Sequence, residues 1–415
     1  MPYCDVGTNQ ATADDRLNNE IKIFYRTYGH GPTKVLLIIG LAGTHDSWGP
    51  QIKGLTGTVL PNEDDSGDSD WNSADQRCGD DNESGGRIEV CAFDNRGMGR
   101  SSVPTKKSAY TTKIMAKDAV ALLDHLGWRK AHVFGHSMGA MIACKLAAMV
   151  PDRVLSLALL NVTGGGFECF PKFNRQTFSI AYRFLKAKTP ELRAAVDLDT
   201  HYSQEYLEEY VGTEKRRTIL YQRDLFQQYV KGISATGMQS NYGFEGQVNA
   251  CWRHQMTRSE IESIKSAGFL VSVIHGRFDV IAQIYYARRL AERLYPMARM
   301  VDLFGGHLVS HERTEEVNQA LLDLIKASEV KMRPEGWTNL PKKTAWWTER
   351  RTLVFSPNIQ GGSVSLKCFV LEKLHLFLIF LVGLLLLVFE YGKKLLKSVV
   401  KPVRVASPPS YVEGQ

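Results

Sequence analysis

The sequence lacks the cysteine patterns that hold together small secreted domains or zinc sites. Its seven cysteines are an odd number and contain no CxxC pair, so neither a disulfide framework nor a structural zinc site is expected. The first stretch, MPYCDVGTNQATADD, contains no apolar run of the kind that a secretory signal needs. Both absences favour a protein of the reducing cytosol. The cysteines are Cys4, Cys78, Cys91, Cys144, Cys169, Cys251 and Cys368.

No nucleic-acid-binding motif accompanies the positive charge of the chain. The formal net charge is +7, but residues 62–86 hold nine acidic side chains and one basic one, so they carry −8 and the other residues carry +15. Without such a motif, this positive remainder favours an anionic membrane surface over nucleic acid as a partner.

The acidic segment 62–86 is rich in Gly, Ser and Asn and poor in large apolar side chains. Such a composition cannot offset the entropy lost on ordering, so we interpret the segment as an acidic disordered surface loop. Its stretch DDSGDSD lacks the glycine at the sixth position and the closing glutamate of a calcium loop. We expect no calcium site here.

Between Glu20 and Ala327, short apolar runs alternate with helical patterns. The runs are almost continuous in Val, Ile and Leu, which is what strands covered on both faces require. The pattern predicts an α/β fold, a mostly parallel sheet with helices on both faces. The clearest strands are Lys34–Gly40, Arg87–Asp94, His132–Gly135, Val154–Val162, Phe269–His275 and Met300–Phe304.

Two regions depart from this alternation and divide the chain. Residues 164–263 read as aromatic-rich helices that leave the sheet and return to it. Beyond residue 330 the composition changes to basic residues and tryptophans, and then to a long apolar run. We therefore predict an α/β domain over 1–330, a linker over 331–367, a membrane-associated helix over 368–392 and a basic tail over 393–415.

The segment Gly135-His136-Ser137-Met138-Gly139 lies between the predicted strand AHVFG and the helical pattern AMIACKLAAMV. A serine hydroxyl is a weak nucleophile and must be held exposed beside a base. A sharp strand-to-helix turn does this, and small flanking residues let the turn close. Ser137 is therefore the candidate nucleophile, and we interpret His136 as a packing or supporting residue.

A histidine that ends a later strand is the candidate base. His307 follows the run Phe304-Gly305-Gly306 and precedes a helical pattern, and an imidazole can take and return the serine proton near neutral pH. The rival His311 lies beyond the end of the strand. The sequence favours His307.

The acid that orients this base is expected at a neighbouring strand end. Asp279 follows the predicted strand Phe269–His275, whereas Asp302 lies inside the last strand and is interpreted as structural. Some related folds place the acid after the preceding strand, where this chain has Asn161, which cannot carry the charge. Asp279 is therefore the candidate acid.

A tetrahedral intermediate needs two backbone N–H groups directed at its oxyanion. One is expected from Met138, the residue after the nucleophile. The other is expected from Leu41, in the loop that follows the predicted strand Lys34–Gly40.

The order Ser137, Asp279, His307 resembles that of the α/β-hydrolase superfamily, and the run DNRGMGRS at residues 94–101 resembles the turn that such proteins carry after their fourth strand. The resemblance covers residues 20–327. It implies the α/β-hydrolase fold, with residues 164–263 as a helical cap inserted after the sixth strand, as in the serine esterase and carbon–carbon hydrolase branch. Ile39 stands where the family often has histidine, but since the oxyanion donor is a backbone N–H, activity should survive.

The resemblance implies hydrolysis of a carboxylic ester, or of a thioester or carbon–carbon bond, through an acyl-enzyme on Ser137 and without cofactor or metal. The expected substrate is a small-molecule ester or a lipid-like one, and the aromatic cap and the apolar tail favour an apolar or lipid-like acyl group. Epoxide hydrolases and dehalogenases need a carboxylate in place of Ser137, and the acyltransferase-like branch has an aspartate where this chain has Glu312. The alternative function is a ligand receptor or signalling scaffold that retains the fold.

The run Leu374–Phe389 has 16 residues without a formal charge, and basic residues follow it. A spanning helix needs about 20 apolar residues, so this run is short for crossing a bilayer. Two arrangements remain open: a helix that enters one leaflet, and a tail anchor that crosses. In both, we expect a membrane-associated protein with its catalytic domain facing the cytosol.

Overall fold

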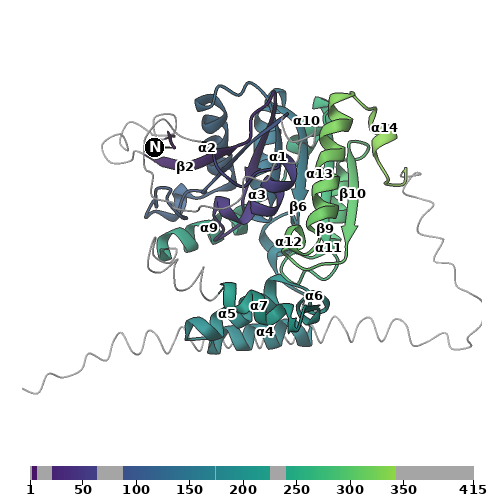
Figure 1. Cartoon of the computed structure of the whole chain (residues 1–415). Coiled ribbons are helices and arrows are strands. Elements are labelled where there is room, and N and C mark those ends of the chain that lie inside the picture. Colours follow the sequence, from purple (N-terminus) through teal and green to yellow (C-terminus); the bar gives the residue numbers. More distant parts are fainter. Residues whose placement is uncertain (1, 7–20, 63–86, 173, 225–239, 343–415) are drawn as a thin grey trace, which may run out of the picture. The chain divides into compact units, whose positions relative to one another are not determined.

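The computed structural model describes residues 2–6, 21–62, 87–172, 174–224 and 240–342 (Figure 1). In these residues, one sheet has eight strands in the order β1-β2-β4-β3-β5-β6-β9-β10. The strands from β4 to β10 in this order are parallel, and β1 and β2 add antiparallel strands at one edge. Their bounds are Tyr3–Asp5 for β1, Lys22–Tyr28 for β2, Thr33–Ile38 for β3, Ile88–Phe93 for β4, Ala131–His136 for β5, Val154–Leu160 for β6, Leu270–Gly276 for β9 and Ala298–Leu303 for β10.

Both faces of the sheet are covered by helices, so the strand residues alternate between two cores. In β3, Leu36 and Ile38 enter one core while Val35 and Leu37 enter the other, and all four are fully buried. The helices that pack in the first core include α2 (Thr112–His125), α3 (Met138–Met149), α10 (Arg258–Ala267) and α11 (Ile284–Arg293). The second core is formed with α1 (Gly49–Thr56), α12 (Val309–Glu312) and α13 (Thr314–Glu329). The α/β fold predicted from the sequence is therefore present.

The chain leaves the sheet after β6 and forms a helical layer. It contains the short helix η5 (Gly166–Cys169), α4 (Arg175–Lys186), α5 (Pro190–His201), α6 (Gln204–Glu208) and α7 (Arg216–Asp224). A small hairpin of β7 (Tyr210–Val211) and β8 (Glu214–Lys215) joins α6 to α7. The sequence pattern predicted only helices here. A separate apolar cluster of Leu198, Tyr202, Leu207 and Leu220 holds this layer together.

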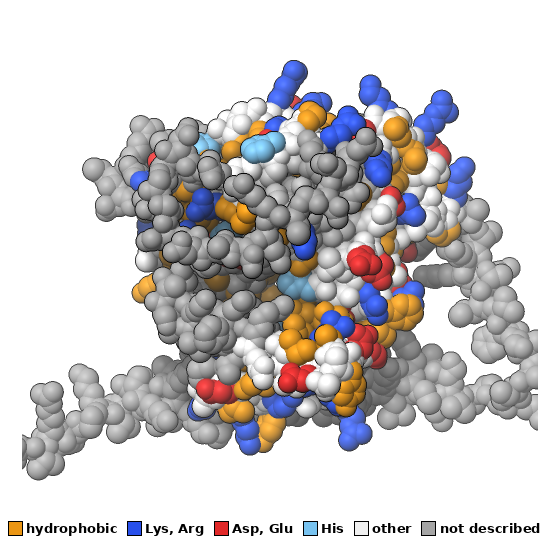
Figure 2. All heavy atoms as spheres, in the orientation of Figure 1, with side chains coloured by type: hydrophobic (Ala, Val, Ile, Leu, Met, Phe, Trp, Pro, Cys, Tyr) orange, Lys and Arg blue, Asp and Glu red, His pale blue; other side chains and the backbone are white. Residues whose placement is uncertain are grey.

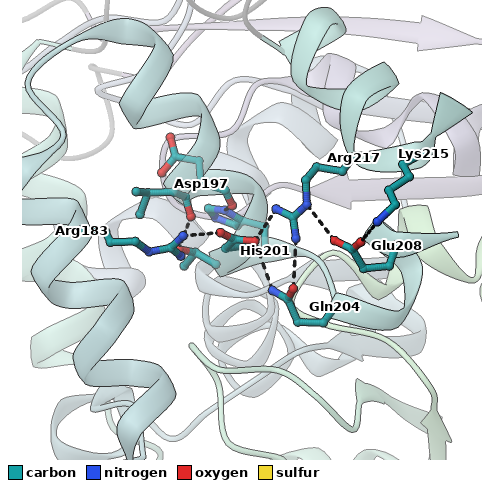
Figure 3. A network of polar contacts seen from close by, with 10 residues as sticks. Arg183, Asp197, His201, Gln204, Glu208, Lys215 and Arg217 are labelled. Carbon is teal, nitrogen blue, oxygen red and sulfur yellow. Dashed lines mark hydrogen bonds and ion pairs between the residues drawn. The ribbon is translucent and has the colours of Figure 1, made fainter.

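A polar network crosses the same layer (Figure 3). The buried Asp199 accepts hydrogen bonds from Arg183 of α4 and Arg217 of α7, each at 2.6 Å. Gln204 also donates to Asp199, at 3.1 Å. These bonds join the four helices α4, α5, α6 and α7, and they lower the pKa of Asp199 against the effect of its burial. The network fixes α4 to the rest of the cap.

The predicted cap range 164–263 contains two kinds of structure. The helix α9 (Asn241–Arg253) and the helix α10 both contribute buried residues to the first core under the sheet, among them Ala250, Ile261 and Ile264. In α10, Ile261 and Ile264 lie on one face at helical spacing, which is the face that packs on α3. Among the described residues, the helical layer that stands apart from the sheet therefore runs from η5 to α7.

The compact unit extends past the predicted boundary at residue 330, up to Lys342. The helix α14 (Pro334–Trp337) places Trp337 in the second core, and its indole N–H donates to the carbonyl of Val271 at 2.8 Å. This burial is why the start of the predicted linker is ordered against the sheet.

Four predicted segments lie wholly or mostly outside the described residues: the acidic loop 62–86, the linker 331–367, the membrane-associated helix 368–392 and the tail 393–415. Among the residues that the structure describes, no helix has both the length and the apolar character needed to cross a membrane.

Candidate active site

Ser137 occupies a sharp turn between β5 and α3. Its φ of 54° and ψ of −119° lie outside the regions that ordinary residues prefer. The flanking glycines explain how the turn closes. A Cβ on Gly135 would lie 2.4 Å from the carbonyl oxygen of Gly139, and a Cβ on Gly139 would lie 2.0 Å from that of Ile38. Because no larger side chain fits at either position, the sequence motif follows directly from this geometry.

Three side chains predicted to act together meet at the carboxyl ends of the parallel strands. Ser137 Oγ lies 3.0 Å from Nε2 of His307, and Nδ1 of His307 lies 2.8 Å from Oδ2 of Asp279. Ser137 follows β5, Asp279 follows β9 and His307 follows β10. Strand ends of a parallel sheet form one edge, which is why residues so distant in sequence come together.

The carboxylate of Asp279 is fully buried and held on both oxygens. Its Oδ1 accepts hydrogen bonds from the backbone N–H groups of Ile281 and Ala282, both at 2.8 Å. Its Oδ2 accepts from Asn161 at 2.6 Å and from His307. Burial by itself raises the pKa of Asp279, but the charge and hydrogen bond of His307, with the contributions of His275 and Asn161, lower it to about 2. The acid is therefore ionised at neutral pH.

The alternatives considered for base and acid lie elsewhere. His311 donates from Nε2 to the carbonyl of Ser47 at 2.8 Å, and Tyr202 lies 3.3 Å from its Nδ1. Asp302 pairs with Arg277 at 2.6 Å and with Arg288. Each is engaged in contacts that hold the fold, away from Ser137.

Two further histidines surround His307. His136 donates from Nε2 to the carbonyl of His307 at 2.9 Å, and burial and the His307 charge lower its pKa to about 3. His201, at the end of α5, lies with its ring centre 6.0 Å from that of His307. Its Nδ1 donates to the carbonyl of Asp197, so in the neutral ring Nε2 is a hydrogen-bond acceptor. Burial and His307 also lower the pKa of His201.

The two predicted oxyanion donors lie on segments that touch each other. Met138 is the first residue of α3, and Leu41 follows Gly40, where a Cβ would lie 3.1 Å from Cβ of Ser137. The Leu41 loop is held from two sides: Asn95 donates to the carbonyl of Ile39 at 2.8 Å, and the N–H of Ala42 donates to Gln247 of α9 at 3.0 Å. The segment is fixed by residues far away in sequence.

Sequence reasoning did not predict the supporting contacts that three residues make at this site: Asn161, Gln247 and Glu312. Glu312 is buried, and it accepts hydrogen bonds from the N–H of Gly306 at 2.7 Å and from the N–H and hydroxyl of Ser203 at 2.9 and 2.5 Å. It thus links the loop that carries His307 to the cap. Burial raises the pKa of Glu312 although these hydrogen bonds oppose the shift.

A cavity of about 840 Å³ lies between the cap and the loop after β9 and reaches Asp279. Its lining is largely polar and includes Arg183, Asp199, Arg217 and Arg277. The aromatic side chains of Phe178, Tyr182 and Phe184 in α4 are exposed to solvent by 49%, 57% and 44%, and none of the three lines this cavity. Within the described residues, no group of three or more His, Cys, Asp or Glu is arranged to hold a metal ion.

The fold, and the three side chains that meet at the strand ends, can be compared with those of known protein families. A family model described as the alpha/beta hydrolase fold matches residues 34–314. The chain belongs to this family.

Among individual proteins, the chain is similar to RutD of Azorhizobium caulinodans, provisionally named a carbamate hydrolase. The two are 30% identical over 169 residues, which is 41% of this chain and 50% of RutD. BpoC of Mycobacterium tuberculosis, provisionally named a non-heme bromoperoxidase, is 27% identical over 231 residues, covering 55% of this chain and 80% of BpoC. The chain spans about half the length, or less, of the RutD proteins that it matches.

Solved structures resemble the fold over most of this chain. The enol-lactonase from Burkholderia xenovorans LB400 aligns with a TM-score of 0.53 and 21% identity, covering 74% of this chain and 98% of the lactonase. The esterase from Thermogutta terrifontis aligns with a TM-score of 0.53 and 19% identity, covering 78% and 98%. At these identities the likeness shows the fold alone.

Proposed function

We propose that this protein is a serine hydrolase that cleaves a carboxylic ester through an acyl-enzyme on Ser137. The observation that carries the proposal is the continuous hydrogen-bonded chain from Ser137 through His307 to the buried, ionised Asp279. A nucleophile, a base within hydrogen-bond reach and a group that orients this base are what nucleophilic catalysis requires.

In the first half of the reaction, Oγ of Ser137 attacks the ester carbonyl while Nε2 of His307 takes its proton. Asp279 holds Nδ1–H and balances the charge of the imidazolium. The carbonyl oxygen becomes an oxyanion that the N–H groups of Met138 and Leu41 would stabilise, and each such donor contributes about 10²–10³ in rate. His307 then returns the proton to the leaving alkoxide, and the acyl group stays on Ser137.

In the second half, a water molecule takes the place of the alcohol. His307 removes its proton as it attacks the acyl carbonyl, and the same donors bind the oxyanion. The proton then goes back to Oγ of Ser137 as the carboxylic acid leaves. These two steps account for every atom and proton of the ester and the water molecule without a cofactor or metal.

The bond that is cleaved is an ester in this proposal, with a thioester and a carbon–carbon bond as variants of the same chemistry. Because RutD is named a carbamate hydrolase, a carbamate is a further candidate substrate, and its carbonyl carbon is an electrophile like that of an ester. A lipid-like acyl group is part of the proposal, and the polar lining of the cavity that reaches Asp279 favours polar groups there.

Labelling with a fluorophosphonate probe, followed by turnover of esters of increasing acyl length, a thioester and a carbamate, tests the proposal. Ser137→Ala is the control for labelling. Labelling at Ser137 with multiple turnovers supports a hydrolase, whereas intact ligand binding with no turnover of any of these substrates would support the receptor function and contradict the proposal.

We also propose that residues 374–389 bind the full chain to membranes with the catalytic unit on the cytosolic side. The apolar run and the basic residues after it support this association. Fractionation of the full chain tests it, and a protein that stays in the soluble fraction would contradict it. Protease treatment of intact vesicles, with a tag after Gln415, separates the two arrangements: the tag is digested if the helix enters one leaflet and protected if it crosses.

A further inference from the structure

The helix α4 carries apolar side chains on two opposite sides. Its inner side packs against α5, where the Arg193 guanidinium lies 3.8 Å from the ring centre of Phe184. Its outer side exposes Phe178, Tyr182 and Leu185, at 49%, 57% and 77%. A surface helix of a soluble protein normally needs one apolar face, the one that packs on the core. The second apolar face of α4 requires another explanation.

The exposed side chains form one continuous stripe. Positions 178, 182 and 185 follow the i, i+4, i+7 spacing that places side chains above one another on a helix. No residue of α4 is buried, so these three side chains lie together on an exposed helix. Contiguous apolar surface of this kind marks a site that contacts another apolar phase or partner.

The charged side chains of α4 and of the residues that flank it in sequence are of one sign. Residues 170–189 contain five basic side chains and no acidic one. Arg183 pairs with Asp199, whereas no ion pair joins Lys172, Arg175, Lys186 or Lys188 to an acid among the described residues, and all four are exposed. Lys186 lies over the ring of Tyr182, 4.6 Å from its centre. Figure 2 shows basic and apolar side chains next to each other along the lower edge, where Figure 1 places α4.

We propose that the outer face of α4 binds an anionic lipid surface, with Phe178, Tyr182 and Leu185 entering the interface and the flanking basic residues contacting lipid headgroups. Basic residues beside an aromatic and aliphatic stripe are the composition of helices that lie in the membrane interface. A helix of 12 residues is about 18 Å long, too short to cross the roughly 30 Å apolar layer. It therefore lies along the surface.

This proposal uses other residues than the apolar run 374–389, and it does not depend on the proposed activity. The charge of residues 170–189 is what selects a lipid surface over a second copy of the chain, because two such cationic faces would repel each other. The polar network around Asp199 ties α4 to α5 and α7, so binding at α4 would hold the cap, and the cavity below it, at the membrane.

The test places an environment-sensitive fluorescent amino acid at position 185 of the full chain, and at position 330 as a matched control. Val330 is an aliphatic residue exposed to 71% beyond the end of α13. Vesicles of phosphatidylcholine and phosphatidylserine, in a ratio of roughly three to one, are compared with vesicles of phosphatidylcholine alone. We expect a blue shift and higher intensity at position 185 with the anionic vesicles, and no change at position 330.

Charge variants in the same full chain test the basic residues. Arg175→Gln with Lys186→Gln should raise the lipid concentration at half-maximal response about 25-fold, about fivefold per charge. The control pair Arg258→Gln with Lys326→Gln removes the same charge away from α4 and should have a far smaller effect. Leu185 is mainly exposed, so replacing it should leave the fold intact.

Three outcomes would overturn the proposal. A chain that sediments with vesicles while the probe at position 185 stays unchanged would show that another part of the protein binds. A probe that is already shielded without lipid would show that a segment of this chain, or a second copy if the shielding depends on protein concentration, covers α4. An equal response to neutral vesicles would remove the role of the charge.

Discussion

Asn161 donates a hydrogen bond to Asp279 across 2.6 Å, to the carboxylate oxygen that also faces His307. Asn161 lies at the end of β6, where some related folds carry the acid itself, and here it supports the acid from the neighbouring strand end. Its amide also lies 3.2 Å from the carbonyl of Gly306. One side chain thus contacts both the acid and the loop that carries the base.

Replacing Asn161 with alanine should lower kcat/KM. A hydrogen bond to a charged group contributes about 1.5–3 kcal/mol, so we expect a loss of roughly 10- to 100-fold. Asn161→Asp should be more damaging and should alter the pH profile, because two carboxylates at this distance share a proton. Steady-state kinetics from about pH 5 to 9 measure both effects around the ordinary range of histidine. An Asn161→Asp enzyme with a wild-type pH profile would show that Asn161 does not influence Asp279.

Ser137→Ala should abolish turnover and probe labelling while leaving the fold unchanged. In triads of this kind, loss of the nucleophile reduces kcat by about 10⁶. Circular dichroism and thermal unfolding serve as the controls for folding. If the variant keeps a substantial part of the activity, another residue is the nucleophile.

Asp279→Asn and Asp302→Asn should differ sharply. The first removes the charge that fixes the His307 tautomer and should reduce kcat by about 10⁴. The second weakens a surface pairing with Arg277 and Arg288 and should change kcat little. Measuring kcat for the two variants under one condition is a matched comparison, and the reverse order would mean that Asp302 is the acid.

The carboxylate of Asp279 also makes the free energy of unfolding depend on pH. The pKa of Asp279 in the folded protein, about 2, lies below the ordinary value of about 3.9. Its stabilising contribution is therefore complete above about pH 4 and is lost as the pH falls toward about 2. In Asp279→Asn this part of the acid dependence should disappear, as seen by urea unfolding at a series of pH values. If the difference in unfolding free energy between the wild type and Asp279→Asn stays constant over this pH range, the pKa of Asp279 is not lowered.

The sequence was sufficient for the parts of the site that local pattern encodes. Ser137 lies in a turn that only small neighbours allow, and Asp279 and His307 follow apolar strands, so parallel pairing brings them together. Asn161, Gln247 and Glu312 act through contacts with residues distant in sequence, and no periodicity marks them. The antiparallel strand Lys22–Tyr28, next to the edge of the sheet, was missed because it mixes buried, partly buried and exposed residues and includes charged side chains.

The last prediction concerns Glu312, which joins the loop of His307 to the cap through Gly306 and Ser203. Glu312→Ala leaves two backbone N–H groups without an acceptor in a buried place, and each costs about 1–3 kcal/mol. We expect lower thermal stability and a reduced kcat, because the loop before His307 loses its anchor. Glu312→Gln keeps an oxygen for both N–H groups, and the Ser203 hydroxyl can turn to accept from the new amide. This variant should keep most of the activity.

Because burial raises the pKa of Glu312, the folded wild type binds a proton more readily than the unfolded chain, so its stability falls as pH rises from about 4.3 through the raised pKa. Glu312→Gln lacks this dependence, so its stability relative to wild type should increase across the same pH range and level off above it. Thermal unfolding and kcat of both variants at several pH values provide the measurement. Equal loss of activity in the two variants would show that the negative charge of Glu312, and not its hydrogen bonds, is what His307 requires.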